Sequence, residues 1–72
     1  MDRKPIIEAA IVKIMKSRKT MYDDQLIESV VAILRPTFVP SPIEIKKRVE
    51  SLVEREFLER DEKEQSLFRY LA

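Results

Sequence analysis

The sequence predicts a small α+β domain in which three helices form a bundle and a short C-terminal β-hairpin follows them. Three segments between residues 3 and 55 carry apolar residues at helical spacing. After residue 56 the pattern changes to two short extended pieces joined by a polar loop. With 72 residues in total, the chain can form one domain with a small core, so nearly every apolar stripe is needed for folding.

The first helix is expected over residues 3–17. Its apolar stripe recurs at helical spacing and comprises Ile7, Ala10, Ile11 and Ile14. Pro5 is tolerated because it lies in the first turn, where its missing N–H has no helical acceptor. The next residues, Thr20, Met21 and Tyr22, favour extended structure and predict a minimal strand.

The second helix is expected to begin at Asp23 and Asp24, because the helix dipole favours negative charge at an N-terminus. It runs to residue 34, and its expected core residues are Leu26, Ile27, Val30, Val31 and Leu34. Residues 35–40 form a loop in which two prolines bracket Phe38 and Val39. We expect both of these side chains to fill the core from outside regular structure.

The third helix has the clearest start signal in the chain. Ser41 is an N-cap residue, Pro42 stands at the first helical position, and Glu44 follows three residues after the cap. The helix runs to residue 55 and is expected to bury Ile45, Val49, Leu52 and Val53. Two short strands, residues 57–60 and 67–71, then flank a polar turn. Helix, strand, helix, helix and hairpin is the order of a small winged helix.

The residue types that are absent exclude most kinds of chemistry. The chain has no Cys, so it has no disulfide, thiolate nucleophile or Cys-based zinc site. It has no His, the commonest general base near neutral pH, and no Gly for a phosphate-binding loop. No cofactor or metal site is predicted, and the sequence argues against catalysis by this chain alone. No apolar run approaches the roughly 20 residues that cross a bilayer, and no signal peptide is visible, so we expect an intracellular protein.

Charge is unevenly distributed, although the formal net charge is only +1. Residues 1–20 carry six basic and two acidic residues, so one end of the chain is basic and suits a charged partner. A solvated helix face would explain the same pattern.

A winged helix commonly binds DNA with its third helix in the major groove, but the charges here oppose this function. At about 100° per residue, the face opposite the core stripe presents Lys47, Glu50 and Glu54. The wing tip is predominantly acidic and comprises Asp61, Glu62, Lys63 and Glu64. Carboxylates at both places would repel the phosphates that supply most DNA affinity. Nucleic acid is therefore not the expected partner.

Lys16 is predicted to point away from the core of the first helix. With Ile7 at zero degrees, Ile11 lies within about 40° of it and Lys16 about 180° away. Ala9 and Val12 lie beside Lys16 on the outer face, where Val12 would add nothing to the domain's own core. The basic residues around this surface are Lys13, Arg18 and Lys19. Exposure alone does not separate Lys16 from the other two lysines.

The segment from Ala9 to Lys19, AAIVKIMKSRK, closely resembles the neddylation motif of cullins. Residues 45–60, IKKRVESLVEREFLER, resemble the third helix and first wing strand of the same cullin domain, and the ending Tyr-Leu-Ala resembles the cullin C-terminus. The likeness spans essentially the whole chain in register. It implies that residues 1–72 are the C-terminal winged-helix domain of a longer scaffold chain. It also implies that Lys16 receives a ubiquitin-like modifier through an isopeptide bond.

The resemblance further implies a non-catalytic scaffold subunit of a cullin-RING ubiquitin ligase in the cytoplasm and nucleus. Attachment of the modifier would release this domain and the RING protein from a closed arrangement into an open, active one. The implied partners are the covalent modifier, a RING-box protein, ubiquitin-conjugating and neddylation-conjugating enzymes, a neddylation co-ligase, a deneddylating complex and an exchange factor. Neither a cofactor nor a membrane is implied.

Two positions depart from the cullin pattern. The family usually has arginine where Lys13 stands, so this chain keeps the charge but adds a competing amine. Pro5 is unusual for the start of this helix. The tripeptides Ser-Arg-Lys and Pro-Ser-Pro favour the third cullin class without identifying the paralogue. A DNA-binding winged helix and a protein-docking winged helix that is never modified are the alternative functions.

Overall fold

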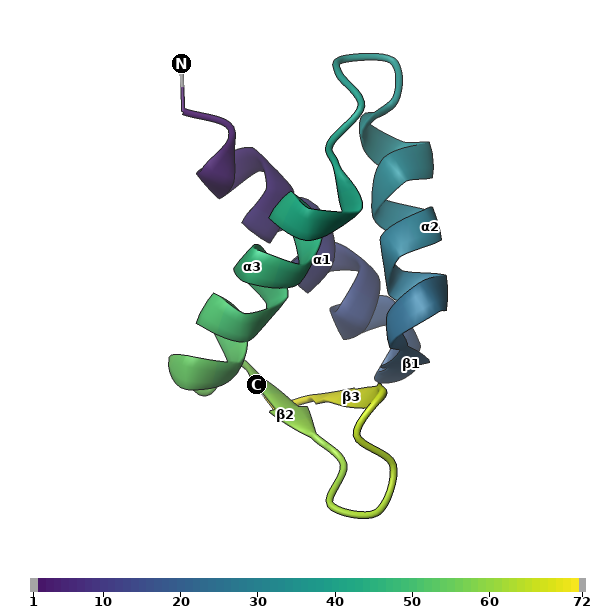
Figure 1. The fold of residues 1–72 in the computed structure, drawn as a ribbon, viewed down its shortest axis with the longest axis vertical. Helices are drawn as coiled ribbons and strands as arrows, with labels where there is room; N and C mark the ends of the chain where they lie inside the picture. Colours follow the sequence, from purple (N-terminus) through teal and green to yellow (C-terminus); the bar gives the residue numbers. More distant parts are fainter. Residues whose placement is uncertain (1, 72) are drawn as a thin grey trace.

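The computed structural model describes residues 2–71, which fold into three helices and three strands (Figure 1). In chain order these are α1 (Lys4–Arg18), β1 (Thr20–Tyr22), α2 (Asp23–Leu34), α3 (Pro42–Glu54), β2 (Leu58–Arg60) and β3 (Leu67–Tyr70). The observed boundaries lie within one residue of the expected ones. The predicted α+β winged-helix fold is confirmed.

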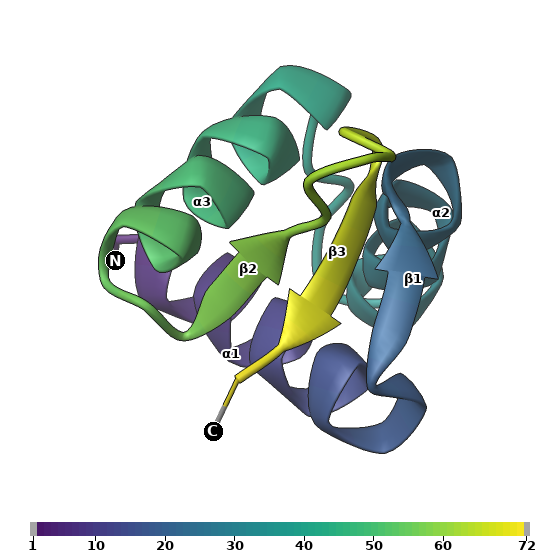
Figure 2. The ribbon, with the colours of Figure 1, turned by 90° about the horizontal axis from the view of Figure 1, so that it is seen from below.

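The strands form one antiparallel sheet in the order β1-β3-β2, so β3 is the central strand (Figure 2). Thr20 pairs with Arg69 on one side of β3, and Leu58 pairs with Tyr70 on the other. The sheet closes one end of the helix bundle, with β1 next to α2 and β2 next to α3 (Figures 1 and 2). The minimal strand after the first helix therefore ties the wing hairpin to the helices.

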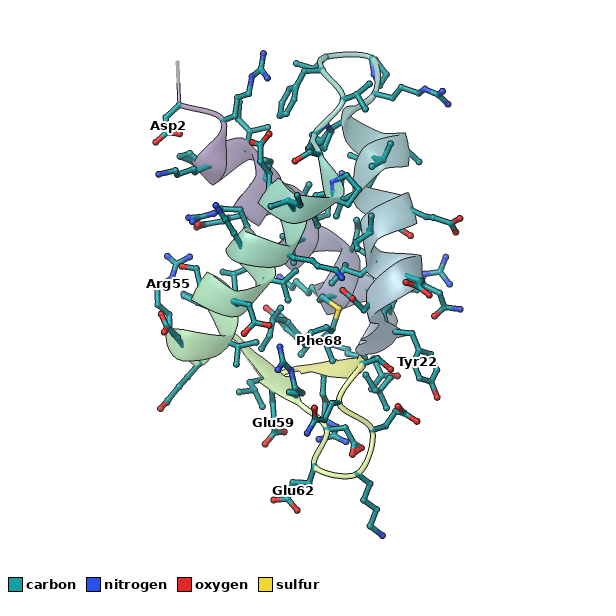
Figure 3. All side chains as sticks on the ribbon, in the orientation of Figure 1. Asp2, Tyr22, Arg55, Glu59, Glu62 and Phe68 are labelled. Carbon is teal, nitrogen blue, oxygen red and sulfur yellow. The ribbon has the colours of Figure 1, made fainter. Side chains whose placement is uncertain are left out.

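The core lies where the three helices meet the inner face of the sheet. Phe68 of β3 is buried between the sheet and the helices, whereas Glu62 lies at the outer tip of the wing loop (Figure 3). The most deeply buried apolar side chains are Ile7, Ile11, Met15, Leu26, Val30, Ile45, Val49, Leu52 and Leu58. Three residues expected in the core are only half-buried at its edge, namely Ile27, Val31 and Val53.

The loop of residues 35–40 fills the core differently from the prediction. Phe38 is half-buried against the core, but Val39 is 64% exposed, and Pro40 is buried in its place. Successive side chains of an extended chain point to opposite sides. Because Phe38 turns inward, Val39 points to solvent and Pro40 returns to the core. The guanidinium carbon of Arg3 lies 4.7 Å from the centre of the Phe38 ring, so it covers the aromatic face.

The helix ends are set by side-chain caps and by two unusual backbone conformations. Ser41 caps α3 as predicted, because its hydroxyl oxygen accepts the N–H of Glu44 at 3.1 Å. Lys19 and Glu56 have positive φ angles of 72° and 64°, in the region that glycine adopts most easily. In a chain without glycine, these two residues turn the backbone out of α1 and α3.

Glu8 joins α1 to α3. Its carboxylate accepts hydrogen bonds from Arg48 at 3.0 Å and from Arg55 at 2.6 Å. Burial alone would raise the pKa of Glu8, but the hydrogen bonds and charges of Arg55 and Arg48 outweigh burial and hold this pKa below its ordinary value of 4.5. These ion pairs link α1 to α3 at the edge of the core.

Glu8→Gln is expected to lower the free energy of unfolding at pH 7 by about 1 kcal/mol, because the charged partner of two partly exposed arginines is lost. The folded-state pKa lies below the unfolded one, so the carboxylate stabilises the fold above pH 4.5. This contribution disappears as the pH falls through the folded-state pKa. Urea unfolding at pH 7 and at pH 3 measures both effects.

Glu62→Gln is the matched control for this substitution, because Glu62 is exposed at the wing tip. It should change the free energy of unfolding little at either pH. A loss of stability that is equally large at pH 7 and pH 3 for Glu8→Gln would contradict the role given to the ionised carboxylate.

Candidate functional site

The C-terminal half of α1 presents the basic surface that the sequence predicted. Every residue from Lys16 to Thr20 is exposed, whereas Ile14 and Met15 are buried. The buried side packs against α2, α3 and the sheet, so the opposite side carries charge without loss of core contacts. Lys16 and Arg18 in the last turn also suit the negative end of the helix dipole.

Lys16 is exposed, in agreement with its angle on the helix. Among residues 2–71 its ammonium group makes no hydrogen bond, ion pair or cation–π contact. The amine is carried on a flexible stem. No contact within this part of the chain has to break before the amine meets a reaction partner.

Lys19 is tied to the central strand of the sheet. Its carbonyl oxygen accepts the N–H of Tyr70 at 2.8 Å, and its Nζ lies 5.4 Å from the centre of the Tyr70 ring. The aromatic face attracts the ammonium group and holds it near the sheet. Sequence analysis missed Tyr70 because only the pairing of β1 with β3, with Thr20 opposite Arg69, brings it to α1. No local sequence pattern predicts this contact.

Lys13 is exposed at the edge of a groove between α1 and α2. The groove has a volume of about 370 Å³, and its walls include Ile14 and Arg18 of α1 and Ile33 of α2. Ile33 is 47% exposed, so this groove combines apolar surface with two cations. The stem of Lys13 therefore borders apolar surface, which can retain part of a lysine side chain.

Val12 does not lie where the sequence analysis placed it. It is half-buried and packs against the core, so the expectation that it adds nothing to the core is wrong. The buried stripe of α1 is wider than expected because Met15 is fully buried. Val12 lies only about 60° around the helix from Met15 and shares its cover. Ala9 is exposed, as predicted.

Basic side chains on α3 and in the wing are largely paired with carboxylates. Within the described residues the pairs are Lys46–Asp23, Arg48–Glu8, Arg60–Glu50, Arg69–Glu59 and Arg69–Asp61. Figure 3 shows Glu59 and Glu62 on the outer side of the wing. Such a surface offers little net positive charge to a phosphate backbone, which supports the expectation that nucleic acid is not the partner.

Residues 2–71 contain no group of three or more His, Cys, Asp or Glu side chains that could hold a metal ion. None of the helices in this range is long and apolar enough to cross a membrane.

Known proteins resemble this chain along nearly its full length. The family model described as the cullin protein neddylation domain matches residues 2–64. Cullin-3A of Arabidopsis thaliana is 59% identical over 71 residues, which are 99% of this chain and 10% of that relative. Cullin-3 of Dictyostelium discoideum is 49% identical over 71 residues, which are 99% of this chain and 9% of that relative. The chain therefore spans about a tenth of the length of these relatives.

The fold is also similar to a chain of a solved structure of Dcn1(P)-Cdc53(WHB), which concerns a dual E3 mechanism for Rub1 ligation to Cdc53. The match has a TM-score of 0.92 and 27% identity, and it covers 97% of this chain and 80% of the other. The likeness thus extends from the sequence to the arrangement of the helices and the sheet. Because the family model matches residues 2–64 and the two relatives are 49% and 59% identical, this chain belongs to the cullin family and contains its neddylation domain.

Proposed function

We propose that this domain accepts a ubiquitin-like modifier on Lys16 and thereby switches a cullin-RING ubiquitin ligase into an open, active state. The observation that carries the proposal is the accessible Lys16 amine, which follows the buried Ile14 and Met15 on the outer side of α1. In the cullin motif that this segment resembles, the lysine after Ile-Met is the acceptor. Residues 1–72 would form the C-terminal domain of a longer scaffold chain.

The reaction asks little of the domain itself. The neutral ε-nitrogen of Lys16 attacks the carbonyl carbon of the thioester that joins the modifier to its conjugating enzyme. The C–S bond breaks, the enzyme's thiolate leaves, and the nitrogen gives up its proton as the isopeptide bond forms. The domain has no His or Cys to assist, so the conjugating enzyme and its co-ligase must remove the proton and align the thioester. In this proposal the domain is an acceptor and not a catalyst.

The switch follows from differential binding. A modifier can favour the open arrangement only if its contacts with the ligase are better there than in the closed one. Lys16 lies on the opposite side of α1 from the core, so a modifier attached there can change external contacts without disturbing the fold. The domain then acts as a rigid carrier between the modifier and the rest of the scaffold.

The solved relative combines Dcn1(P) with Cdc53(WHB), which supports a neddylation co-ligase as a partner of this domain. The other partners follow from membership of a ligase scaffold family. We propose a RING-box protein, the two kinds of conjugating enzyme, a deneddylating complex and an exchange factor. The basic surface around Lys16 suits partners with acidic surfaces.

Reconstituted modification followed by peptide mapping tests the proposal. The full scaffold that carries this domain is assembled with its RING partner, incubated with the modifier, its activating and conjugating enzymes and ATP, and digested. The isopeptide-linked remnant is expected on Lys16 in nearly all of the product. Predominant attachment to Lys13 or Lys19 would contradict the assignment, and absence of attachment would favour an unmodified docking domain.

A further inference from the structure

We infer that Lys13 is a second, slower acceptor for the same modifier when Lys16 is unavailable. This inference rests on the proposed function. It concerns a residue that stands one turn before Lys16 on α1 and is likewise exposed. It makes the acceptor site of this domain a pair of amines rather than a single one.

Helix geometry places the two amines within reach of one thioester. Residues three positions apart on a helix are neighbours, with Cβ atoms about 5–6 Å apart. Lys13 and Lys16 both belong to the regular part of α1, and each ammonium group is carried on four methylenes. A thioester that is aligned with Lys16 therefore needs only a small displacement to meet Lys13.

The contacts of Lys13 explain why it is slower than Lys16. Lys13 borders the groove between α1 and α2, next to the half-exposed Ile33, and apolar surface there competes for its stem. Its direction also differs from that of Lys16 by about 60° around the helix. The amine thus has to leave the groove and turn toward the thioester before it can attack.

Lys19 is also exposed, but its contacts exclude it from this role. Its ammonium group lies over the Tyr70 ring, and its backbone carbonyl is bonded to the N–H of Tyr70. Its positive φ angle places it beyond the last turn of α1, so helix geometry no longer aligns it with Lys16. Lys13 is consequently the only amine of the pattern Lys13, Lys16 and Lys19 that shares the regular helix with Lys16.

Attachment of the modifier to Lys13 forms and breaks the same bonds as attachment to Lys16. The neutral nitrogen of Lys13 attacks the thioester carbonyl of the modifier, the C–S bond breaks, and the thiolate of the conjugating enzyme leaves. One proton passes from the nitrogen to a base of the enzyme or to water. No oxidant, reductant or further reactant is required beyond the conjugating enzyme that carries the modifier as a thioester.

The test measures single-turnover transfer of the modifier to the full scaffold with its RING partner. The donor is the conjugating enzyme that carries the modifier as a thioester. Lys16→Arg is expected to slow transfer roughly 100-fold, the order of loss that follows from misplacing a reacting group by a small distance. Peptide mapping should place the residual product on Lys13. The double variant Lys13→Arg with Lys16→Arg should give no product, and Lys16→Arg with Lys19→Arg should react like Lys16→Arg alone.

The outcomes separate this inference from the proposed function. Complete loss of transfer in Lys16→Arg, or a residual product on Lys19, would overturn the role of Lys13 and leave Lys16 as the acceptor. Wild-type rates in Lys16→Arg would overturn the assignment of Lys16 itself. The substituted lysines are exposed and arginine keeps their positive charge. The circular dichroism spectrum of each variant should therefore match that of the wild type.

Discussion

Lys16→Arg is expected to hold ubiquitin transfer by the proposed ligase near the level of the unmodified complex, over the time in which the modifier system fully modifies the wild-type complex. Arginine keeps the positive charge and helix preference of lysine, but its guanidinium stays protonated and does not attack a thioester. Lys16 makes no ion pair or hydrogen bond within residues 2–71, so the substitution removes one reactive amine and no structural contact. The variant therefore separates modification from folding.

In the proposed switch, the size of the effect depends on how strongly the modifier shifts the equilibrium between the closed and open arrangements. A shift from one open complex in a hundred to nearly all of them requires a difference in binding free energy of about 5.5 kcal/mol between the two states. If only the open arrangement transfers ubiquitin, activity rises by up to roughly 100-fold on modification. The rate of ubiquitin transfer by the Lys16→Arg complex should not show this increase during the time in which the wild-type complex becomes fully modified.

Pulse-chase transfer of labelled ubiquitin to a bound substrate measures this prediction. Each complex is assayed before and after treatment with the modifier system. Lys19→Arg provides the matched control, because it makes the same chemical change three residues away and should still be activated like the wild type. Activation of the Lys16→Arg complex to the wild-type level would show that the switch does not depend on this amine.

The order of elements could be predicted because several boundaries have a local cause. Ser41 and Pro42 start α3, and the acidic pair Asp23 and Asp24 starts α2, so these ends are encoded by residues next to them. Helical periodicity likewise sufficed to place Lys16 on the outer side of α1. Features of this kind need no knowledge of the tertiary structure.

The errors occurred where a residue's environment comes from distant parts of the chain. Val12 is half-buried because Met15 and the elements packed on α1 widen its buried stripe. Val39 is exposed because its neighbours Phe38 and Pro40 turn inward, a choice that apolar character alone cannot reveal. Helical spacing and a count of apolar residues predict whether a segment is a helix or a strand. They do not predict how wide its buried face is.

The basic surface at the end of α1 shows the same division between local and distant causes. Exposure of Lys13 and Lys16 follows from periodicity, but the difference between these lysines and Lys19 does not. Lys19 is distinguished by Tyr70, which reaches it only through the register of β3 with β1. Strand register depends on the completed sheet, so a sequence reading could list three amines and could not rank their contacts.

Ile45→Ala is expected to lower the free energy of unfolding by about 2–5 kcal/mol, because a fully buried side chain is truncated and leaves a cavity. Ile45 lies in the first half of α3 and contributes to the core shared by the three helices. A domain of this size has a stability of only a few kcal/mol from its single core. The variant should therefore be largely unfolded at 37 °C and lose modifier transfer for that reason alone.

Ile43→Ala makes the same chemical change two residues earlier in the same helix, where the side chain is 68% exposed. Its free energy of unfolding should remain within about 0.5 kcal/mol of the wild-type value. Urea unfolding of both variants, followed by helical circular dichroism, gives the two free energies directly. Equal losses for Ile43→Ala and Ile45→Ala would contradict the role given to the burial of Ile45, because alanine improves helix propensity at both positions and only Ile45 is buried. Since propensity and burial predict opposite signs for Ile45→Ala, the direction of its change alone decides which of them controls the stability of α3.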